Sequence, residues 1–91
     1  MSGEKSGGSS VAKVVGVALA GAGVAHFIRP ELFDGITGQA FPRDTRTHVY
    51  IDGSIETAIG LGLTTRKTRP LAIIGLIGYG AYLAGNVVRN R

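Results

Sequence analysis

The chain has no cysteine and no tryptophan, and its 91 residues make one small domain at most. Without cysteine there can be no disulfide, no thiolate metal site and no cysteine nucleophile. A chain this short also has difficulty building a sizeable soluble core. The spacing supports no serine–histidine–acid set and no metal-ligand pair such as HExxH, so we predict no catalytic residue and no metal site, while enzymatic activity stays open.

Long runs without charge are what the sequence does contain. Hydrophobic residues make up 44% of the chain, and they gather in three blocks that are flanked by the lysine and arginine residues from Lys13 onward. The third block, Pro70 to Val88, has 19 residues without a charge, close to the length that spans a bilayer. We therefore predict an all-α, small polytopic protein of the plasma membrane. It would be a three-helix transmembrane bundle with helices over about 11–28, 49–65 and 70–88.

The remaining segments are expected to lie outside the membrane. Residues 1–10 are rich in glycine and serine and predict a flexible tail, so that 11–91 form the single membrane domain. Residues 29–48 form an interfacial connection, in which Pro30 can start a short helix that turns Leu32, Phe33 and Ile36 toward lipid. The first block also resembles a signal peptide, but it continues into Phe27 without a polar region, which favours an uncleaved helix.

The basic residues that give the formal net charge of +4 flank the apolar blocks. This placement favours lipid headgroups as the partner, whereas nucleic-acid binding would require basic residues gathered on one face among aromatic ones. We expect no nucleic-acid partner. Basic residues divide five to five between the two membrane sides, and the dense segment RKTR at 66–69 favours an N-terminus inside.

Glycines recur within all three blocks and predict close helix packing. The segments GLIGYG and GLGLTTRKT look like phosphate loops, but Arg66 stands where a P-loop needs glycine, and no strand precedes GLIGYG. Each of Gly75, Gly78 and Gly85 is expected to contact another helix. The helix-packing glycines are predicted to be Gly16, Gly23, Gly60, Gly75, Gly78 and Gly85.

Polar residues inside the blocks predict a seam between helices. His48, Asp52 and Glu56 follow i, i+4, i+8 spacing on one face of the second block. A lone carboxylate facing lipid costs roughly 2.5 to 3.5 kcal/mol, so Glu56, the deeper of the two, needs a protein partner, whereas Asp52 can reach the interface. We predict that Glu56 pairs with His26 and that Asp52 pairs with Arg29.

The third block adds Tyr79, Tyr82 and Asn86 at i, i+3, i+7 spacing, which is typical of interhelical hydrogen bonds. The candidate intramembrane polar seam is therefore His26, His48, Asp52, Glu56 and Asn86.

Five short motifs taken together resemble the DoxX-like family of small bacterial membrane proteins. They are HFIRPELFDGI at 26–36, proline at 42, DGSIETAIGLGL at 52–63, RKTRPLA at 66–72 and GNVV at 85–88. The resemblance implies an all-helical membrane protein, here shortened because the family commonly has a fourth helix. It also implies a respiratory association, since some members are subunits of quinone-linked oxidoreductases.

Three functions remain open from the sequence. The first is a non-catalytic accessory or scaffold component that forms a homo-oligomer or joins a larger membrane complex. The second is a quinone- or redox-linked subunit of an oxidoreductase, in which quinone would be the cofactor; the first function requires none. The third is a small oligomeric transporter or channel lined by the polar seam.

Overall fold

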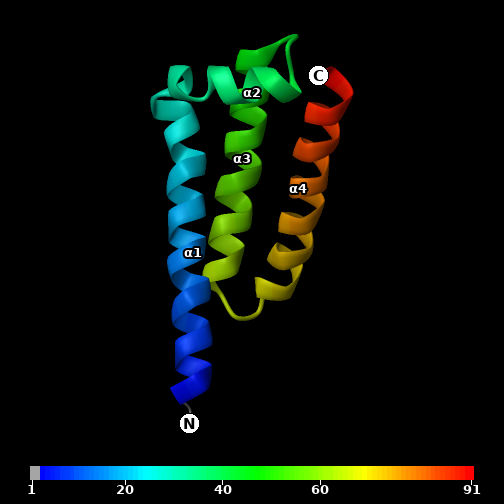
Figure 1. Ribbon diagram of the computed structural model, residues 1–91. Helices are drawn as coiled ribbons and strands as arrows, with labels where there is room; N and C mark the ends of the chain where they lie inside the picture. Colours follow the sequence, from blue (N-terminus) through cyan, green and yellow to red (C-terminus); the bar gives the residue numbers. More distant parts are fainter. Residues whose placement is uncertain (1–2) are drawn as a thin grey trace.

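The computed structural model describes residues 3–91, and within them the chain is helical with no strand. Three long helices run antiparallel to their neighbours in the chain: α1 (Gly3–Ile28), α3 (Thr45–Thr64) and α4 (Arg69–Asn90). A 3₁₀ turn, η1 (Pro30–Leu32), and the short helix α2 (Asp34–Ala40) cross one end of the bundle (Figure 1). The all-α prediction is confirmed.

Helix α1 begins earlier than the sequence predicts. It starts at Gly3 instead of residue 11, because glycine and serine only weaken a helix and no proline stops it from continuing toward the N-terminus. The predicted flexibility of residues 1–10 stays a prediction, and residues 1 and 2 lie outside the described part of the chain. At its other end α1 stops before Pro30, since Arg29 has left the helical conformation (φ −133°, ψ 64°).

The connection after α1 contains two helical elements instead of the single short helix that the sequence predicts. Pro30 starts the 3₁₀ turn as expected, and α2 then follows as a separate element. Leu32 and Ile36 are exposed, in agreement with a lipid-facing role. Phe33 instead turns inward, where its ring stacks on the His26 ring at 3.7 Å between centroids. The connection therefore closes one end of the bundle.

Helix α3 begins at Thr45, four residues before the expected start, after Asp44 has turned the chain in a left-handed conformation (φ 55°). It ends at Thr64, where side chains of the following turn satisfy its last carbonyl groups. The Thr68 hydroxyl donates to the Gly62 oxygen at 2.7 Å, and Arg69 Nε donates to the Leu63 oxygen at 2.9 Å. These two bonds join the end of α3 to the start of α4.

Glycines allow α1 and α3 to pack with their backbones almost in contact. Gly16 faces Gly60, and Gly23 faces Gly53, so two glycines seven residues apart on one helix meet two seven apart on the other. A methyl group on Gly16 would lie 2.5 Å from the Gly60 carbonyl oxygen. The packing predicted for Gly16, Gly23 and Gly60 is confirmed.

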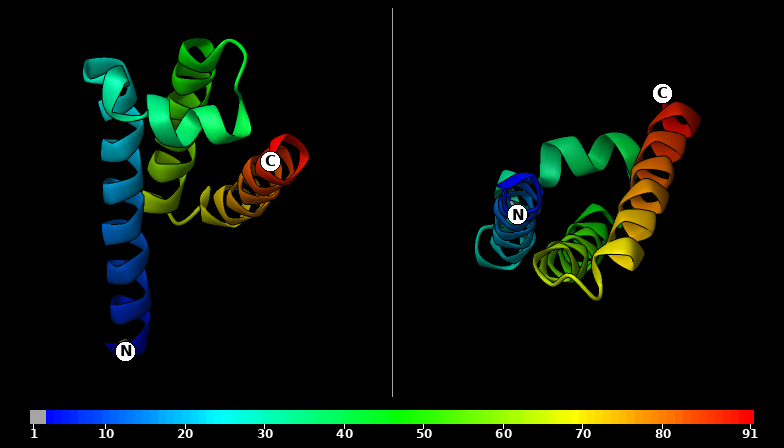
Figure 2. Two further views of the ribbon diagram at one scale, coloured as in Figure 1. Left: turned by 45° about the horizontal axis from the view of Figure 1, so that its top comes forward. Right: turned by 90° about the horizontal axis from the view of Figure 1, so that it is seen from below.

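Helix α4 packs on α3 but does not touch α1, and it leans away along its length (Figure 2). Its buried residues, Ala72 and Tyr79, join Ile59 and Leu63 of α3 in a small core. Gly75 faces Ile59 of α3, because a Cβ added at Gly75 would lie 3.6 Å from the Ile59 side chain, an ordinary van der Waals distance.

Two of the predicted packing glycines of α4 have no such neighbour within the chain. A Cβ at Gly78 or Gly85 would meet nothing within 4 Å, so the expected contact of these two residues with a helix of another chain stays a prediction. Gly78 and Gly85 follow Ala72 by six and thirteen residues. At helical periodicity this spacing places both glycines on the face of α4 that is turned away from Ala72 and Tyr79.

Candidate functional site

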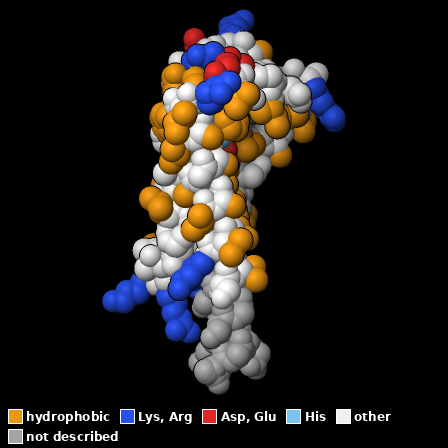
Figure 3. Space-filling model, turned by 90° about the vertical axis from the view of Figure 1, so that its left-hand side faces the viewer, with side chains coloured by type: hydrophobic (Ala, Val, Ile, Leu, Met, Phe, Trp, Pro, Cys, Tyr) orange, Lys and Arg blue, Asp and Glu red, His pale blue; other side chains and the backbone are white. Residues whose placement is uncertain are grey.

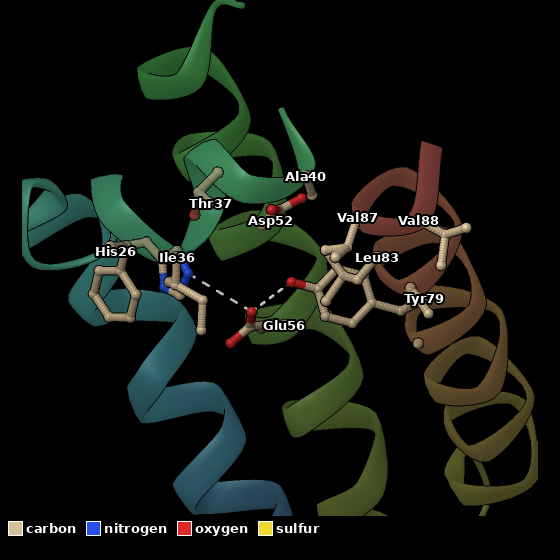
Figure 4. Close-up of a pocket in the computed structure, with 13 residues that line it drawn as sticks. His26, Ile36, Thr37, Ala40, Asp52, Glu56, Tyr79, Leu83, Val87 and Val88 are labelled. Atoms are coloured by element: carbon tan, nitrogen blue, oxygen red, sulfur yellow. Dashed lines mark hydrogen bonds and ion pairs between the residues drawn. The ribbon is translucent and has the colours of Figure 1, made fainter. Parts of the chain in front are cut away.

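The space between α1 and α4 is a pocket of about 610 Å³ (Figure 4). Helix α2 covers one end of this pocket, and α3 lies between α1 and α4. Its walls are mostly apolar, and its polar groups come from α1, α2, α3 and α4. The lining residues are His26, Phe33, Ile36, Thr37, Ala40, Asp52, Glu56, Tyr79, Gly80, Leu83, Ala84, Val87 and Val88.

Glu56 is the centre of the polar end of this pocket. The Tyr79 hydroxyl donates a hydrogen bond of 2.5 Å to Glu56 Oε2, and His26 Nε2 lies 3.6 Å from the same oxygen (Figure 4). The predicted pairing of Glu56 with His26 is confirmed. One carboxylate therefore connects the three long helices, because its partners lie on the helices at either side.

The hydrogen bond at the other ring nitrogen of His26 constrains where its protons lie. Nδ1 is 2.6 Å from the Ala22 carbonyl oxygen, which can only accept, so Nδ1 carries the hydrogen. A neutral His26 then presents a bare Nε2 to an ionised Glu56, and two acceptors would face each other.

Asp52 is 3% exposed and accepts a hydrogen bond of 3.2 Å from the Tyr82 hydroxyl. The prediction that Arg29 pairs with Asp52 is wrong. Arg29 follows the last residue of α1 and is exposed, and its Nε donates instead to Glu31 Oε1 at 2.9 Å, two residues along the chain. This exposed pair lowers the pKa of Glu31, through the hydrogen bond from Arg29 above all.

His48 and Asn86 are not brought to the same pocket. His48 Nδ1 lies 3.1 Å from the Asp44 carbonyl oxygen, and its ring stacks on Phe41. The side-chain amide of Asn86 donates to the Tyr82 carbonyl oxygen of its own helix at 2.8 Å. Both residues line a second, smaller hollow at the same end of the bundle. The five residues of the predicted seam therefore divide between two sites.

Sequence reasoning did not find the pocket or the partners of its carboxylates. The spacing of Tyr79 and Tyr82 predicted interhelical hydrogen bonds, which are confirmed, but not that each hydroxyl would reach a different carboxylate. Thr37, which is buried against the pocket, carried no signal at all. Among the described residues, no group of three histidine or acidic side chains is placed to hold a metal ion.

By length and apolar composition, two helical segments could cross a membrane: Ser10–Ile28 of α1 and Arg69–Asn90 of α4. Only 11% of the α4 window is buried, and large apolar side chains such as Leu71, Ile74 and Ile77 are exposed. On the face that Figure 3 shows, lysine and arginine side chains gather toward the top and at the lower part of the described surface, and the surface between them is free of these basic side chains. Fold and surface together define a small helical protein with two candidate membrane spans and a pocket that carries carboxylates.

Among known families, the model described as a domain of unknown function (DUF8561) matches residues 15–90, and the chain belongs to this family. No curated protein and no solved structure is significantly similar to it. The matched segment covers α1 from residue 15 onward, the connection, α3 and α4, so the pocket lies wholly within the family domain. The resemblance to the DoxX-like family stays a prediction.

Proposed function

We propose that the protein is a multi-pass protein of the plasma membrane that acts, without catalysis of its own, as a component of a homo-oligomer. In this proposal α1, α3 and α4 all cross the bilayer. The observation that carries it is the outer face of α4, which is apolar, contains small residues and has no partner within the chain.

The positions of the charged residues support three crossings. Lys13 and Arg29 bracket the apolar part of α1 about 24 Å apart at helical rise, and Arg69 and Arg89 bracket α4 about 30 Å apart. The hydrocarbon core of a bilayer is about 30 Å thick. Helix α3 has 20 residues and lies between α1 and α4. Its two carboxylates accept hydrogen bonds from tyrosines of α4 instead of facing lipid.

The two ends differ in charge, which supports an orientation. Among side chains of residues 10–91, the end with the α3–α4 turn carries Lys13, Arg66, Lys67 and Arg69 and no acidic residue. The opposite end combines five basic residues with the acidic residues Glu31, Asp34 and Asp44. The number of basic residues does not separate the two ends, but Arg66, Lys67 and Arg69 are concentrated in one short turn. Because dense positive charge is retained on the cytoplasmic side, we place the α3–α4 turn and the N-terminus there.

The outer face of α4 supports self-association. Leu71, Ile74, Gly78, Ala81 and Gly85 follow the alternating three- and four-residue spacing of a helix-packing stripe, and all five are exposed. Glycine and alanine at such positions let helix backbones approach closely in a membrane, where van der Waals packing drives association. A second α4 presents the same stripe, as a symmetric interface requires.

The test is Gly78→Leu, studied in mild detergent by light scattering and by crosslinking in native membranes. We expect the oligomer to dissociate while each chain remains folded, because a side chain at Gly78 meets nothing within its own chain. Gly21→Leu is the matched control, since Gly21 is an equally open glycine on α1. An oligomer that survives Gly78→Leu, or one that Gly21→Leu dissociates equally, would overturn the proposal.

A further inference from the structure

The pocket between α1 and α4 has the size and lining of a small-molecule site. Its volume of about 610 Å³ falls within the range of sites for drug-sized ligands, and most of its wall is apolar. Leu83, Ala84, Val87 and Val88 form the wall on α4, and Ile36 and Ala40 form the wall on α2. The polar groups are concentrated where α3 meets these walls (Figure 4). The ligand of such a pocket has an apolar body and one polar head.

The polar end has hydrogen-bond acceptors that are not used. His26 is 4% exposed, yet its Nε2 has no hydrogen bond from any described residue, and its nearest charged atom is Glu56 Oε2 at 3.6 Å. Asp52 is 3% exposed, and only its Oδ1 receives a hydrogen bond from the described side chains. The Tyr79 hydroxyl, in contrast, already donates to Glu56. The Thr37 hydroxyl is the one lining donor with no bond assigned among the described residues.

The charged residues of the lining, like its unused acceptors, favour a ligand with a hydrogen-bond donor or a positive charge at its head. Two carboxylates, Asp52 and Glu56, line the pocket, and no lysine or arginine does. Glu56 has the Tyr79 hydroxyl and the His26 ring beside it, whereas Asp52 has only the Tyr82 hydroxyl as a hydrogen-bond partner among the described side chains. In a low-dielectric pocket an uncompensated carboxylate attracts a cation strongly, and the rings of Phe33 and Tyr79 can contribute cation–π contacts.

We propose that this pocket binds a lipophilic monovalent organic cation, an amine or an onium ion with an apolar body. The cationic head lies between Asp52 and Glu56, and the body lies along the apolar wall of α4. An oxidised quinone fits less well, because its two carbonyl groups need donors where the pocket offers mainly acceptors. The proposal goes beyond the assembly role and does not depend on it, since all of the lining belongs to one chain.

The experiment uses the purified full chain in an uncharged detergent and two probes of similar shape and opposite charge. Tetraphenylphosphonium and tetraphenylborate are titrated separately by isothermal calorimetry, and ubiquinone-1 serves as the third probe. We expect one tetraphenylphosphonium per chain and no saturable binding of the other two. Glu56→Gln and Asp52→Asn should each weaken phosphonium binding about tenfold or more, since each removes a charge at the head.

Matched controls separate charge at the pocket from charge elsewhere. Glu31→Gln and Asp34→Asn remove carboxylates that do not line the pocket, and both should bind tetraphenylphosphonium within about twofold of the unmodified chain. Ala84→Phe fills the pocket from exposed helix surface and leaves every carboxylate in place, so it should abolish binding even if Glu56→Gln does not fold. Ile73→Phe, which lies closer to the start of α4 and outside the pocket lining, should leave tetraphenylphosphonium binding unchanged.

Three results would overturn the proposal: equal binding of both tetraphenyl ions, no saturable binding of tetraphenylphosphonium, or tighter binding of the quinone. Loss of binding in Ile73→Phe to the same extent as in Ala84→Phe would also count against it. Light scattering on the same samples measures the oligomeric state separately from cation binding. The Gly78→Leu variant should lose the oligomer and still bind tetraphenylphosphonium, so failure of one proposal can be distinguished from failure of the other.

Discussion

Glu56 is the residue on which the three long helices depend most directly. It accepts a short hydrogen bond from Tyr79 of α4 and lies 3.6 Å from His26 of α1. A carboxylate in an apolar bundle is costly unless its oxygen atoms are satisfied, so its partners contribute to stability by removing that cost. His26 is fixed in turn by the Ala22 carbonyl oxygen and by the ring of Phe33.

The His26–Glu56 pair predicts a non-additive double mutant. Glu56→Ala and His26→Ala should each lower the free energy of unfolding by roughly 1 to 3 kcal/mol, because each leaves a buried polar partner unsatisfied. The double variant should cost less than the sum by about 0.5 kcal/mol or more. Denaturant titration in detergent measures all three. Strict additivity would show that the two groups do not interact.

The two tyrosine–carboxylate bonds differ in length, which predicts a ranking. Tyr79→Phe should destabilise the chain by about 1.5 to 3 kcal/mol, the range for a hydrogen bond to a charged group. Tyr82→Phe should cost clearly less, because its bond to Asp52 is 3.2 Å long. Denaturation followed by circular dichroism compares the two variants. Equal losses would mean that bond length does not rank these contacts.

The pair between Asp34 and Arg46 predicts a pH effect outside the membrane segments. Arg46 donates two hydrogen bonds to the carboxylate, which lowers the pKa of Asp34. A lowered pKa in the folded state adds stability above the unfolded pKa, and this is lost as pH falls through the folded value. Asp34→Asn should therefore be less stable than the unmodified chain at pH 7, and the difference should shrink below about pH 4. A difference that stays constant down to pH 2 would contradict this.

At the scale of elements, the same residue type has two unrelated environments. Gly16 and Gly60 bring α1 and α3 into backbone contact, whereas Gly78 and Gly85 of α4 have an open side. The spacing of small residues predicted helices with close-packing faces, and it did so correctly for α1 and α3. It could not show which face of α4 turns inward. That depends on Ala72 and Tyr79, which bind α4 to Ile59 and to Glu56 through contacts distant in sequence.

The site illustrates the same limit. The helical spacing of Asp52 and Glu56, together with the antiparallel run of α1 and α3, made the pairing with His26 predictable. The partner of Asp52 was not, because Arg29 finds Glu31 two residues away and Tyr82 comes from a helix 30 residues farther along the chain. Local competition and long-range geometry decide such contacts, and neither follows from spacing alone.

A glycine comparison tests the packing of α1 on α3. Gly60→Ala should destabilise the fold by about 1 to 3 kcal/mol, because the new methyl group would collide with the backbone of Ala20. Gly21→Ala should be neutral or stabilising by up to about 1 kcal/mol, since it gains helix propensity in open space. Thermal unfolding in detergent distinguishes them. A Gly60→Ala variant as stable as the unmodified chain would contradict the close approach.

For the whole molecule, an odd number of long helices places the two termini at opposite ends (Figure 1). If all three helices cross the bilayer, the termini lie on opposite sides of the membrane. The chain has no cysteine of its own, so single cysteines can be introduced without a background signal.

Cysteine accessibility therefore tests the membrane arrangement. Cysteines at Val17 and Ile77 should resist a membrane-impermeant maleimide, whereas those at Lys67 and Arg91 should react from opposite sides of an intact membrane. Solubilised protein, in which all four positions become accessible, is the control for reactivity. Free labelling at Val17 or Ile77 in intact membranes, or labelling of Lys67 and Arg91 from the same side, would refute three crossings.

Helix α4 packs on α3 and on α2, but among the described residues it has no contact with α1. It is held by the turn at 65–68, by the two tyrosine bonds to α3 and by the hydrogen bond from Asn90 to the Ala40 carbonyl oxygen, whereas its edge toward α1 is free. In a bilayer, the lateral pressure of the lipid chains acts on that free edge. The thickness or curvature of the surrounding membrane would then alter the angle between α4 and α3, and with it the width of the pocket beside Glu56.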